Sequence, residues 1–230
     1  ESSEPGEFAV LGKTLFFTAR DVGGQMNLWR SNGTAKGTQR VTAPSRWAAG
    51  STGPELTVAG RKRNFFMADD GSHGRELWTS DGTALGTRMV KDIHPGGGQE
   101  TSDLVIVGDV VFFSADDGMN GREPWRSDGT EAGTYMLADL QAGREGSKPY
   151  YLVPVGKRVF FSAFGDGVGD ELFVSDGMRA GTKLVADLVP GTGSSAPFGL
   201  KRAGKNLYFN AATIDLGREL WVIGNAESGR

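Results

Sequence analysis

The sequence predicts an all-β protein: a five-bladed β-propeller of four-stranded antiparallel blades, in which the last blade has only three strands. Three observations lead to this prediction. A motif that ends in an aromatic residue occurs five times, at intervals of 47 to 49 residues. The complete intervals contain four short apolar segments separated by turn residues. Tandem units of roughly 40–50 residues with four strands each are typical of propeller blades.

The repeat is defined by three sets of matched positions. The motif aromatics are Trp29, Trp78, Trp125, Phe173 and Trp221. An aromatic pair precedes each of them, at Phe16-Phe17, Phe65-Phe66, Phe112-Phe113, Phe160-Phe161 and Tyr208-Phe209. A second Gly-Thr follows the first four, at Gly37-Thr38, Gly86-Thr87, Gly133-Thr134 and Gly181-Thr182. Chance is a poor explanation for agreement at so many positions.

The third unit shows how each repeat divides into strands. We expect strands at Leu104–Val107, Val110–Ala115, Glu123–Ser127 and Tyr135–Leu140. Asp-Gly dipeptides between them supply the positive φ angles of tight hairpin turns. Apolar runs such as Val110 to Phe113 indicate strands whose sheet is covered on both faces. A linear β-solenoid is the alternative, but the repeat length and the four strands favour blades.

The chain reads as a single propeller domain, 1–230, with repeats at about 1–49, 50–97, 98–145, 146–193 and 194–230. It begins in a linker before the first strand and ends before the fourth strand of the last blade. The expected count is therefore 19 strands. The third strand of that blade, roughly Glu219–Ile223, becomes an exposed edge, which can pair with another chain.

Composition excludes several classes of protein. The 230 residues carry 25 basic and 28 acidic side chains, so the net charge is −3. This balance and the lack of a basic block argue against a nucleic-acid or anionic-membrane partner. Membrane insertion is not expected, because no apolar run approaches the roughly 18–20 residues needed to span a bilayer. The chain has no cysteine, which excludes disulfides and thiolate metal sites. Aromatic residues make up 10% of the chain, too many for a disordered segment.

The best copy of the motif, Gly74–Thr83, reads GRELWTSDGT, and Gly121–Thr130 reads GREPWRSDGT. These segments resemble the ELWxxDGT repeat family, and the resemblance extends from about Phe8 to Trp221. The sequence departs from the consensus at Asn27, Asn32, Pro124, Phe173 and after Trp221. The family consists mostly of secreted or surface-attached bacterial proteins, so the resemblance implies a location outside the cell. It implies no reaction.

Aromatic residues are the first candidates for ligand binding, because their faces stack on sugars. We expect the five motif aromatics to form the core between blades, where large aromatic side chains usually lie. Trp47 differs, because no other unit has a tryptophan in its linker. We therefore predict an exposed ligand platform at Trp47, followed by the loop residues His73, Asn120 and Asp166.

Acidic loops precede the motif, with Asp69-Asp70 in the second unit and Asp116-Asp117 in the third. They suggest calcium, but they lack the alternating carboxylates of known calcium loops. Turn capping, in which Asp bonds its own backbone, is the preferred interpretation. We also expect the repeated Arg-Glu pairs and the acids Asp92, Asp139 and Asp187, on the fourth strands, to lock each blade. No cofactor is expected, and calcium is the only metal considered.

Catalysis finds little support in the sequence. The two histidines, His73 and His94, belong to one repeat, and no hydrolase or phosphate-binding motif occurs. A glycosidase needs two carboxylates at a set separation. The expected innermost segments contain none; they are Phe8–Leu11, Leu56–Ala59, Leu104–Val107, Leu152–Val155 and Leu200–Ala203.

The sequence therefore predicts a non-catalytic, extracellular binding or adhesion module that recognises glycan or another surface polymer. The alternative is a structural module of a larger surface protein that works through protein contacts, including self-association through the edge of the fifth blade. A glycoside hydrolase is a minor alternative.

Overall fold

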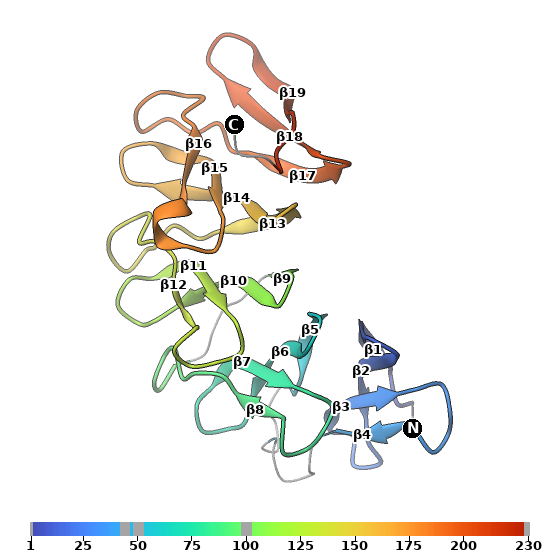
Figure 1. Ribbon diagram of the computed structural model, residues 1–230. Helices are drawn as coiled ribbons and strands as arrows, with labels where there is room; N and C mark the ends of the chain where they lie inside the picture. Colours follow the sequence, from blue (N-terminus) through green and yellow to red (C-terminus); the bar gives the residue numbers. More distant parts are fainter. Residues whose placement is uncertain (1, 42–46, 48–52, 98–102, 228–230) are drawn as a thin grey trace. The chain divides into compact units, whose positions relative to one another are not determined.

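A computed structural model describes residues 2–41, 47, 53–97 and 103–227, and the protein is all-β in these residues (Figure 1). They contain 19 strands and one short 3-10 helix, η1 (Arg179–Gly181). The strands form five antiparallel sheets, four of them four-stranded and one three-stranded. The expected number of strands and the three-stranded last sheet are therefore confirmed. No helix in the described ranges is long and apolar enough to span a bilayer.

Each sheet follows chain order. The first contains β1 (Gly6–Leu11), β2 (Thr14–Arg20), β3 (Met26–Ser31) and β4 (Gln39–Arg40), and the second contains β5 (Glu55–Ala59), β6 (Asn64–Asp69), β7 (Arg75–Ser80) and β8 (Arg88–Met89). The third contains β9 (Leu104–Val107), β10 (Val110–Asp116), β11 (Arg122–Ser127) and β12 (Tyr135–Met136). The fourth contains β13 (Tyr150–Val155), β14 (Arg158–Gly165), β15 (Gly169–Ser175) and β16 (Lys183–Ala186), and the fifth contains β17 (Phe198–Ala203), β18 (Asn206–Thr213) and β19 (Gly217–Ile223).

Two expectations about strand bounds are wrong. The fourth strands are short, and β8 and β12 have two residues each, so Asp92, Asp139 and Asp187 lie beyond the fourth strands and not on them. The first strands β1 and β5 begin earlier than expected and so contain the carboxylates Glu7 and Glu55. Glu55 forms an ion pair with Arg75, and Glu7 is exposed.

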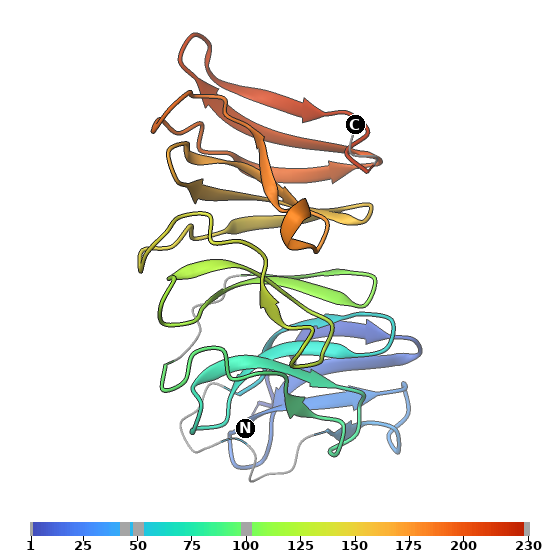
Figure 2. The same ribbon diagram turned by 60° about the vertical axis from the view of Figure 1, so that its left-hand side comes forward.

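The chain divides into two compact units, and each is described by itself. One comprises residues 1–100, 108–111 and 127–134; the other comprises 101–107, 112–126 and 135–230. In the first unit, the first and second sheets share a core of Phe16, Leu28, Val41, Trp47, Phe66, Ala68 and Trp78. In the second unit, the fourth and fifth sheets share a core that includes Val155, Phe160, Leu172, Leu200 and Phe209. Figure 2 shows these two sheets lying one above the other.

Every sheet has two faces. We call the face on the side of the next sheet in the sequence the forward face, and the opposite face the rear face. The forward face of the first sheet carries Phe16 and Leu28 and packs on the second sheet. The rear face of the second sheet carries Phe66 and Trp78, which are direct neighbours across β6 and β7, and receives that forward face. Alternate residues of a strand point to opposite faces, so one aromatic of each pair points forward and the other points to the rear.

The Ser-Asp-Gly-Thr turn that follows β7 and β11 explains two glycines that recur in the repeat. Gly82 has φ +91°, and a Cβ atom there would lie 3.2 Å from Cζ of Phe16. Gly86 is needed for a different reason, because a Cβ atom would lie 2.0 Å from Oδ1 of Asp81. That carboxylate accepts hydrogen bonds from the Thr83 backbone N–H at 2.9 Å and from its hydroxyl at 2.7 Å, and the Thr83 hydroxyl is the chief cause that lowers the Asp81 pKa. The turn is therefore built around one aspartate.

Trp29, Trp78 and Trp221 are each hydrogen-bonded to the second strand of their own sheet. The indole N–H donates to a backbone carbonyl ten residues earlier, from Trp29 to Ala19 at 3.1 Å and from Trp78 to Ala68 at 3.1 Å. Trp221 repeats this contact in the fifth sheet at 3.2 Å. Buried Trp side chains commonly satisfy their N–H in this way. Trp78, Trp125 and Phe173 are buried, whereas Trp29 and Trp221 are partly buried.

Candidate functional site

The predicted loop sites of the second and third sheets are turns closed by their own side chains. Asp70 accepts the backbone N–H groups of Ser72 at 2.9 Å and His73 at 3.0 Å, and Nδ1 of His73 lies 2.9 Å from Asp70 Oδ2. Asp69 accepts the N–H of Gly71 at 2.7 Å. The carboxylate raises the pKa of His73 mainly through this hydrogen bond. Burial opposes ionisation of Asp70, but the hydrogen bonds prevail and lower its pKa.

The loop of the third sheet repeats this construction without a histidine. Asp117 accepts the backbone N–H of Asn120 at 2.8 Å and of Met119 at 2.9 Å, and the Asn120 side-chain amide donates to its second oxygen at 2.8 Å. Asp116 accepts the N–H of Gly118 at 2.7 Å. The amide N–H groups lower the pKa of Asp117 against the opposing effect of burial. Both loops therefore show the Asx-type turns expected from the sequence.

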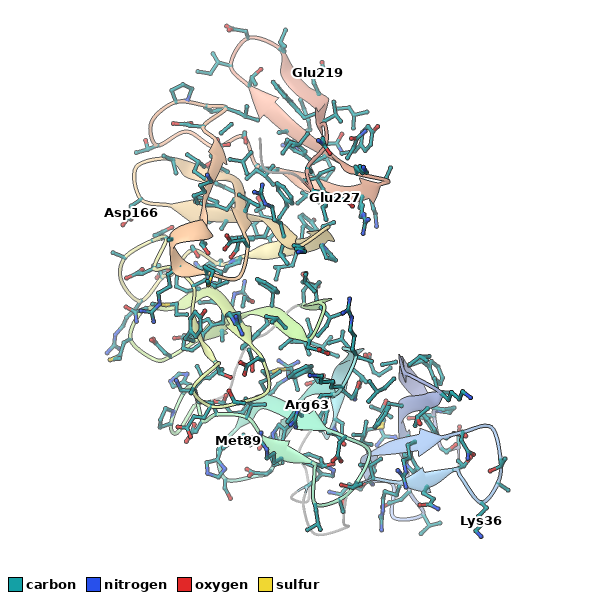
Figure 3. All side chains as sticks on the ribbon, in the orientation of Figure 1. Lys36, Arg63, Met89, Asp166, Glu219 and Glu227 are labelled. Atoms are coloured by element: carbon teal, nitrogen blue, oxygen red, sulfur yellow. The ribbon has the colours of Figure 1, made fainter. Side chains whose placement is uncertain are left out.

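Asp166 lies at an exposed loop tip of the fourth sheet (Figure 3). Its carboxylate accepts the backbone N–H of Ala142 at 3.2 Å, and its own N–H donates to the Leu140 carbonyl at 2.8 Å. The side chain thus holds the linker that leads into its sheet. Within the described residues, no group of three or more His, Asp or Glu side chains is arranged to hold a metal ion.

The predicted platform at Trp47 is wrong. The Trp47 side chain is only 2% exposed, because its ring packs edge-on against Phe66 and Trp78 with centroids 6.3 and 5.0 Å apart. Its carbonyl accepts the side-chain amide of Gln25 at 2.6 Å. A buried indole offers no face to a ligand, so Trp47 belongs to the core of the first unit.

The rear face of the first sheet holds a row of aromatic rings that no other sheet of its unit covers. Phe8 stacks on Phe17 with centroids 6.3 Å apart, and Phe17 stacks on Trp29 at 6.4 Å. Phe8 is 61% exposed. A pocket of about 550 Å³ opens beside this row, lined among others by Phe17, Arg20 and Trp29.

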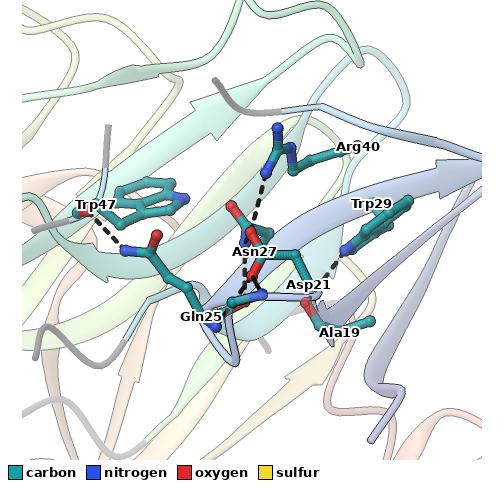
Figure 4. Close-up of polar contacts among 8 residues, drawn as sticks. Ala19, Asp21, Gln25, Asn27, Trp29, Arg40 and Trp47 are labelled. Carbon is teal, nitrogen blue, oxygen red and sulfur yellow. Dashed lines mark hydrogen bonds and ion pairs between the residues drawn. The ribbon is translucent and has the colours of Figure 1, made fainter. Parts of the chain in front are cut away.

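Asp21 organises the polar side of this pocket (Figure 4). Its Oδ2 accepts from the Arg40 guanidinium at 3.0 Å and from the Asn27 amide at 3.1 Å, and its Oδ1 accepts the N–H of Gly23 at 2.9 Å and of Gln25 at 3.2 Å. Desolvation by itself raises the pKa of Asp21, but these hydrogen bonds and the charge of Arg40 outweigh it, so the pKa lies below its ordinary value. The site combines an aromatic floor with a fixed carboxylate and guanidinium, which suits binding by stacking and hydrogen bonds.

A buried glutamate of the motif fastens the linker that follows the third and fourth sheets, a role that the sequence did not reveal. Glu123 accepts the N–H groups of Leu140 at 3.1 Å and Ser147 at 2.8 Å, and the Ser147 hydroxyl at 2.5 Å. Glu171 accepts the N–H and the hydroxyl of Ser195 at 2.9 and 2.5 Å. Desolvation by burial raises the pKa of both carboxyls. The shared spacing of 24 residues between glutamate and serine was the available signal.

The same motif glutamate is also buried in the second sheet but exposed in the fifth. Glu76 is 0% exposed and accepts the backbone N–H of His94 at 3.0 Å. Asn27 replaces the glutamate in the first sheet and is likewise buried. Glu219, labelled in Figure 3, is exposed. The buried motif glutamates of the second, third and fourth sheets therefore bond to the chain that follows their own sheet. The locking of blades by Arg-Glu pairs stays a prediction.

No family model matches the chain, and a search of curated proteins found no match. Solved structures do match. A puromycin-hydrolyzing peptidase of Mycobacterium tuberculosis is 15% identical with a TM-score of 0.57, over 96% of this chain and 36% of the peptidase. Prolyl oligopeptidase B from Galerina marginata is 10% identical with a TM-score of 0.57, over 95% and 32% of the two chains.

A putative TolB from Agrobacterium tumefaciens is 11% identical with a TM-score of 0.50, over 96% of this chain and 77% of that protein. The antiparallel four-stranded sheets thus have the fold of the β-propeller domains of TolB and of peptidases. This chain spans about a third of the length of the two peptidases. At such low identity the similarity concerns the fold alone.

Proposed function

We propose that this chain is a non-catalytic interaction module, in which propeller-type blades bind other molecules through exposed sheet faces. The observation that carries the proposal is the exposure of Leu220 on β19. Leu220 is 69% exposed, whereas Leu77 and Leu172 at the matched positions are 0% and 2% exposed. Val222 beside it is 55% exposed. Exposed apolar patches on soluble proteins mark interaction sites.

The proposal includes the finer form of the fold, in which the five sheets are five successive blades. It also includes a location outside a bacterial cell, secreted or at the surface. The location rests on the resemblance of Gly74–Thr83 to the ELWxxDGT repeat, and the number of blades rests on the five copies of the motif.

Glycan recognition is the second candidate function, and the pocket beside Trp29 favours it. Aromatic rings can stack on sugars while Arg20, Asp21 and Arg40 supply the polar groups that orient a small polar ligand. The loops at His73, Asn120 and Asp166 support it less, because each of these side chains bonds within its own loop or a neighbouring linker.

The interaction role is tested by site-specific photo-crosslinking. The chain has no cysteine, so Leu220→Cys and the control Ile214→Cys can each carry one benzophenone label. Ile214 is 76% exposed in the loop between β18 and β19. We expect adducts from position 220 that position 214 does not give, identified by mass spectrometry and reproduced with the purified partner. Equal labelling from both positions contradicts the proposal.

The glycan role is tested on a glycan array, once with calcium and once with a chelator. Arg20→Ala should weaken a sugar bound in the pocket, and Arg61→Ala serves as an exposed control outside it. Glycan binding that both substitutions reduce equally, or no binding to any glycan on the array, contradicts glycan recognition in this pocket. A signal lost with the chelator would assign metal binding to the acidic loops.

A further inference from the structure

The basic residues of the fourth sheet all lie at one end of it. The β13–β14 hairpin and the turn after β15 meet at this end, and the β14–β15 loop lies at the other (Figure 1). The basic residues between positions 150 and 186 are Lys157, Arg158, Arg179 and Lys183. Asp176 is the one acidic residue of this segment at the same end, and its carboxylate accepts the backbone N–H of Met178 at 2.9 Å. We call this end of the fourth sheet its basic end.

A pocket of about 280 Å³ opens at the basic end, between the fourth and fifth sheets of the second unit. Phe160 pairs with Val174, and Val174 with Lys183, so the three side chains share the forward face of the fourth sheet. Arg158 and Lys183 supply the cations of the pocket, Phe160 and Val174 are its buried apolar floor, and the turn at Asn225 completes it. Neither the Arg158 nor the Lys183 side chain forms a hydrogen bond or ion pair with another residue that the structure describes.

The side chain that begins the fourth strand explains why the pocket is open at this sheet. Arg88 begins β8 and donates to the carbonyl of Gly129, in the turn of the following sheet, at 2.7 Å. Tyr135 begins β12, and its hydroxyl donates to the carbonyl of Gly177 in the same way at 3.1 Å. Lys183 begins β16 but is exposed, and no such bond joins it to the described part of the next turn. The space that Arg88 and Tyr135 close therefore stays open beside Lys183.

Tyr135 shows which kind of group such a space receives. The guanidinium groups of Arg126 and Arg179 lie 5.3 and 5.4 Å from the centroid of its ring, within the range of cation–π contacts. One ring thus fills the space, lies beside two cations and reaches a turn carbonyl with its hydroxyl. The pocket beside Lys183 has two cations and a turn but no ring of its own, so it suits a ligand ring that carries hydroxyls and an anion.

We propose that this pocket binds a carboxylated sugar residue of an acidic polysaccharide. The carboxylate lies between Arg158 and Lys183, where charge-assisted hydrogen bonds are stronger than neutral ones. An apolar face of the sugar ring packs on Phe160 and Val174, and its hydroxyls bond to the turn at Asn225. A few polar groups around an apolar floor are typical of small-molecule sites.

The overall charge favours a sugar acid over a nucleic acid. The chain has a net charge of −3, so it has no long-range attraction for a long polyanion, and binding depends on the local contacts in the pocket. This inference rests on the proposed function as a non-catalytic binding module. It names a ligand for a surface that is separate from Leu220 and from the pocket beside Trp29.

The test is isothermal titration calorimetry with trigalacturonate and with its methyl ester, which has the same rings without the charge. We expect the acid to bind at least about tenfold more tightly than the ester, the ratio for one charged hydrogen bond. Arg158→Gln and Lys183→Gln should each weaken binding of the acid by about tenfold. Lys157→Gln is the matched control, because it removes the same charge from an exposed neighbour outside the pocket, and it should leave the affinity unchanged.

A further substitution uses the chain's own repeat. Lys183→Tyr copies Tyr135, so its ring should fill the pocket and abolish binding of trigalacturonate while the thermal unfolding temperature stays at or above that of the wild type. Because Lys183 is exposed, Lys183→Gln tests the pocket even if Arg158→Gln fails to fold. Undiminished binding by Lys183→Tyr places the ligand elsewhere and contradicts the proposal.

Other results also overturn the proposal. Equal affinity for the acid and the ester, or equal losses from Lys157→Gln and Lys183→Gln, excludes a carboxylate held in this pocket. Binding of a short single-stranded oligonucleotide without binding of trigalacturonate assigns the basic end to nucleic acid instead. If trigalacturonate does not bind but position 220 gives specific adducts, only this inference fails, whereas failure of both removes the proposed binding function as well.

Discussion

Replacement of Glu123 by alanine should destabilise the protein far more than the same replacement of Glu219. Glu123 is 0% exposed and accepts four hydrogen bonds, from three backbone N–H groups and the Ser147 hydroxyl. Glu219 stands at the matched position of the fifth sheet and is exposed. The comparison isolates the buried contact, because the residue and its place in the strand are the same.

The expected loss in the free energy of unfolding follows from the number of hydrogen-bond donors that alanine leaves without an acceptor. Each buried N–H without a partner costs about 1–3 kcal/mol. Three such groups remain, at Leu140, Gln141 and Ser147, and relief of the burial of a carboxylate offsets part of the loss. We expect Glu123→Ala to lower the free energy of unfolding by about 3 kcal/mol. Glu219→Ala should stay within about 0.5 kcal/mol of wild type.

Urea denaturation followed by tryptophan fluorescence measures both values. Ser147→Ala, alone and combined with Glu123→Ala, completes a double-mutant cycle, in which contacting residues show a coupling free energy of about 0.5–3 kcal/mol. Equal losses for Glu123→Ala and Glu219→Ala, or strictly additive losses in the cycle, would refute linker anchoring by the motif glutamate.

The pH dependence gives an independent check. Burial raises the pKa of Glu123 above its ordinary value of 4.5 in the folded protein. The folded state therefore binds the proton more tightly, and this contribution to stability is complete below pH 4.5 and is lost as the pH rises through the folded pKa. The stability of the wild type should decline more steeply with pH over this window than that of Glu123→Ala.

Three further predictions follow from the structure. Trp47→Ala should lower the free energy of unfolding by about 3–5 kcal/mol, because the indole is buried, and an unchanged urea midpoint would contradict this. Gly86→Ala should destabilise by about 1–3 kcal/mol through a clash with the turn aspartate, whereas Gly224→Ala, with nothing within 4 Å, should be neutral in the same assay. Asp70→Asn should lower the His73 pKa in an NMR titration, and an unchanged value would disprove the ion pair.

The strands and turns were predictable because they depend on local chemistry. Third-unit strands β9 and β11 lie within one residue of their expected bounds. The turn glycines were predictable for the same reason, since the turn requires a positive φ angle at Gly82. The fourth strands were overestimated, because Tyr135–Leu140 has strand-forming residues throughout but leaves the ladder after Met136 to become a linker.

The candidate site was much harder to predict, because it depends on contacts between distant parts of the chain. A lone tryptophan in a polar linker reads as exposed, and nothing near Trp47 shows that it packs on Phe66 and Trp78. The buried role of Glu123 depends on a serine 24 residues later. The pocket beside Trp29 has no local signal, because Trp29 occupies the same motif position as Trp78.

In a repeat protein, the environment of a residue is set by its neighbouring units as much as by its own motif. Leu172 and Leu220 occupy the same motif position on the third strands of adjacent sheets, yet they are 2% and 69% exposed. Glu171 and Glu219 differ in the same way, since Glu171 is buried and bonds to Ser195, whereas Glu219 is exposed. Both differences separate the fourth sheet from the fifth although the motif residues are the same, so the surroundings of these side chains and not the motif decide their exposure. The exposed motif leucine Leu220 is therefore available to an apolar surface supplied by another molecule.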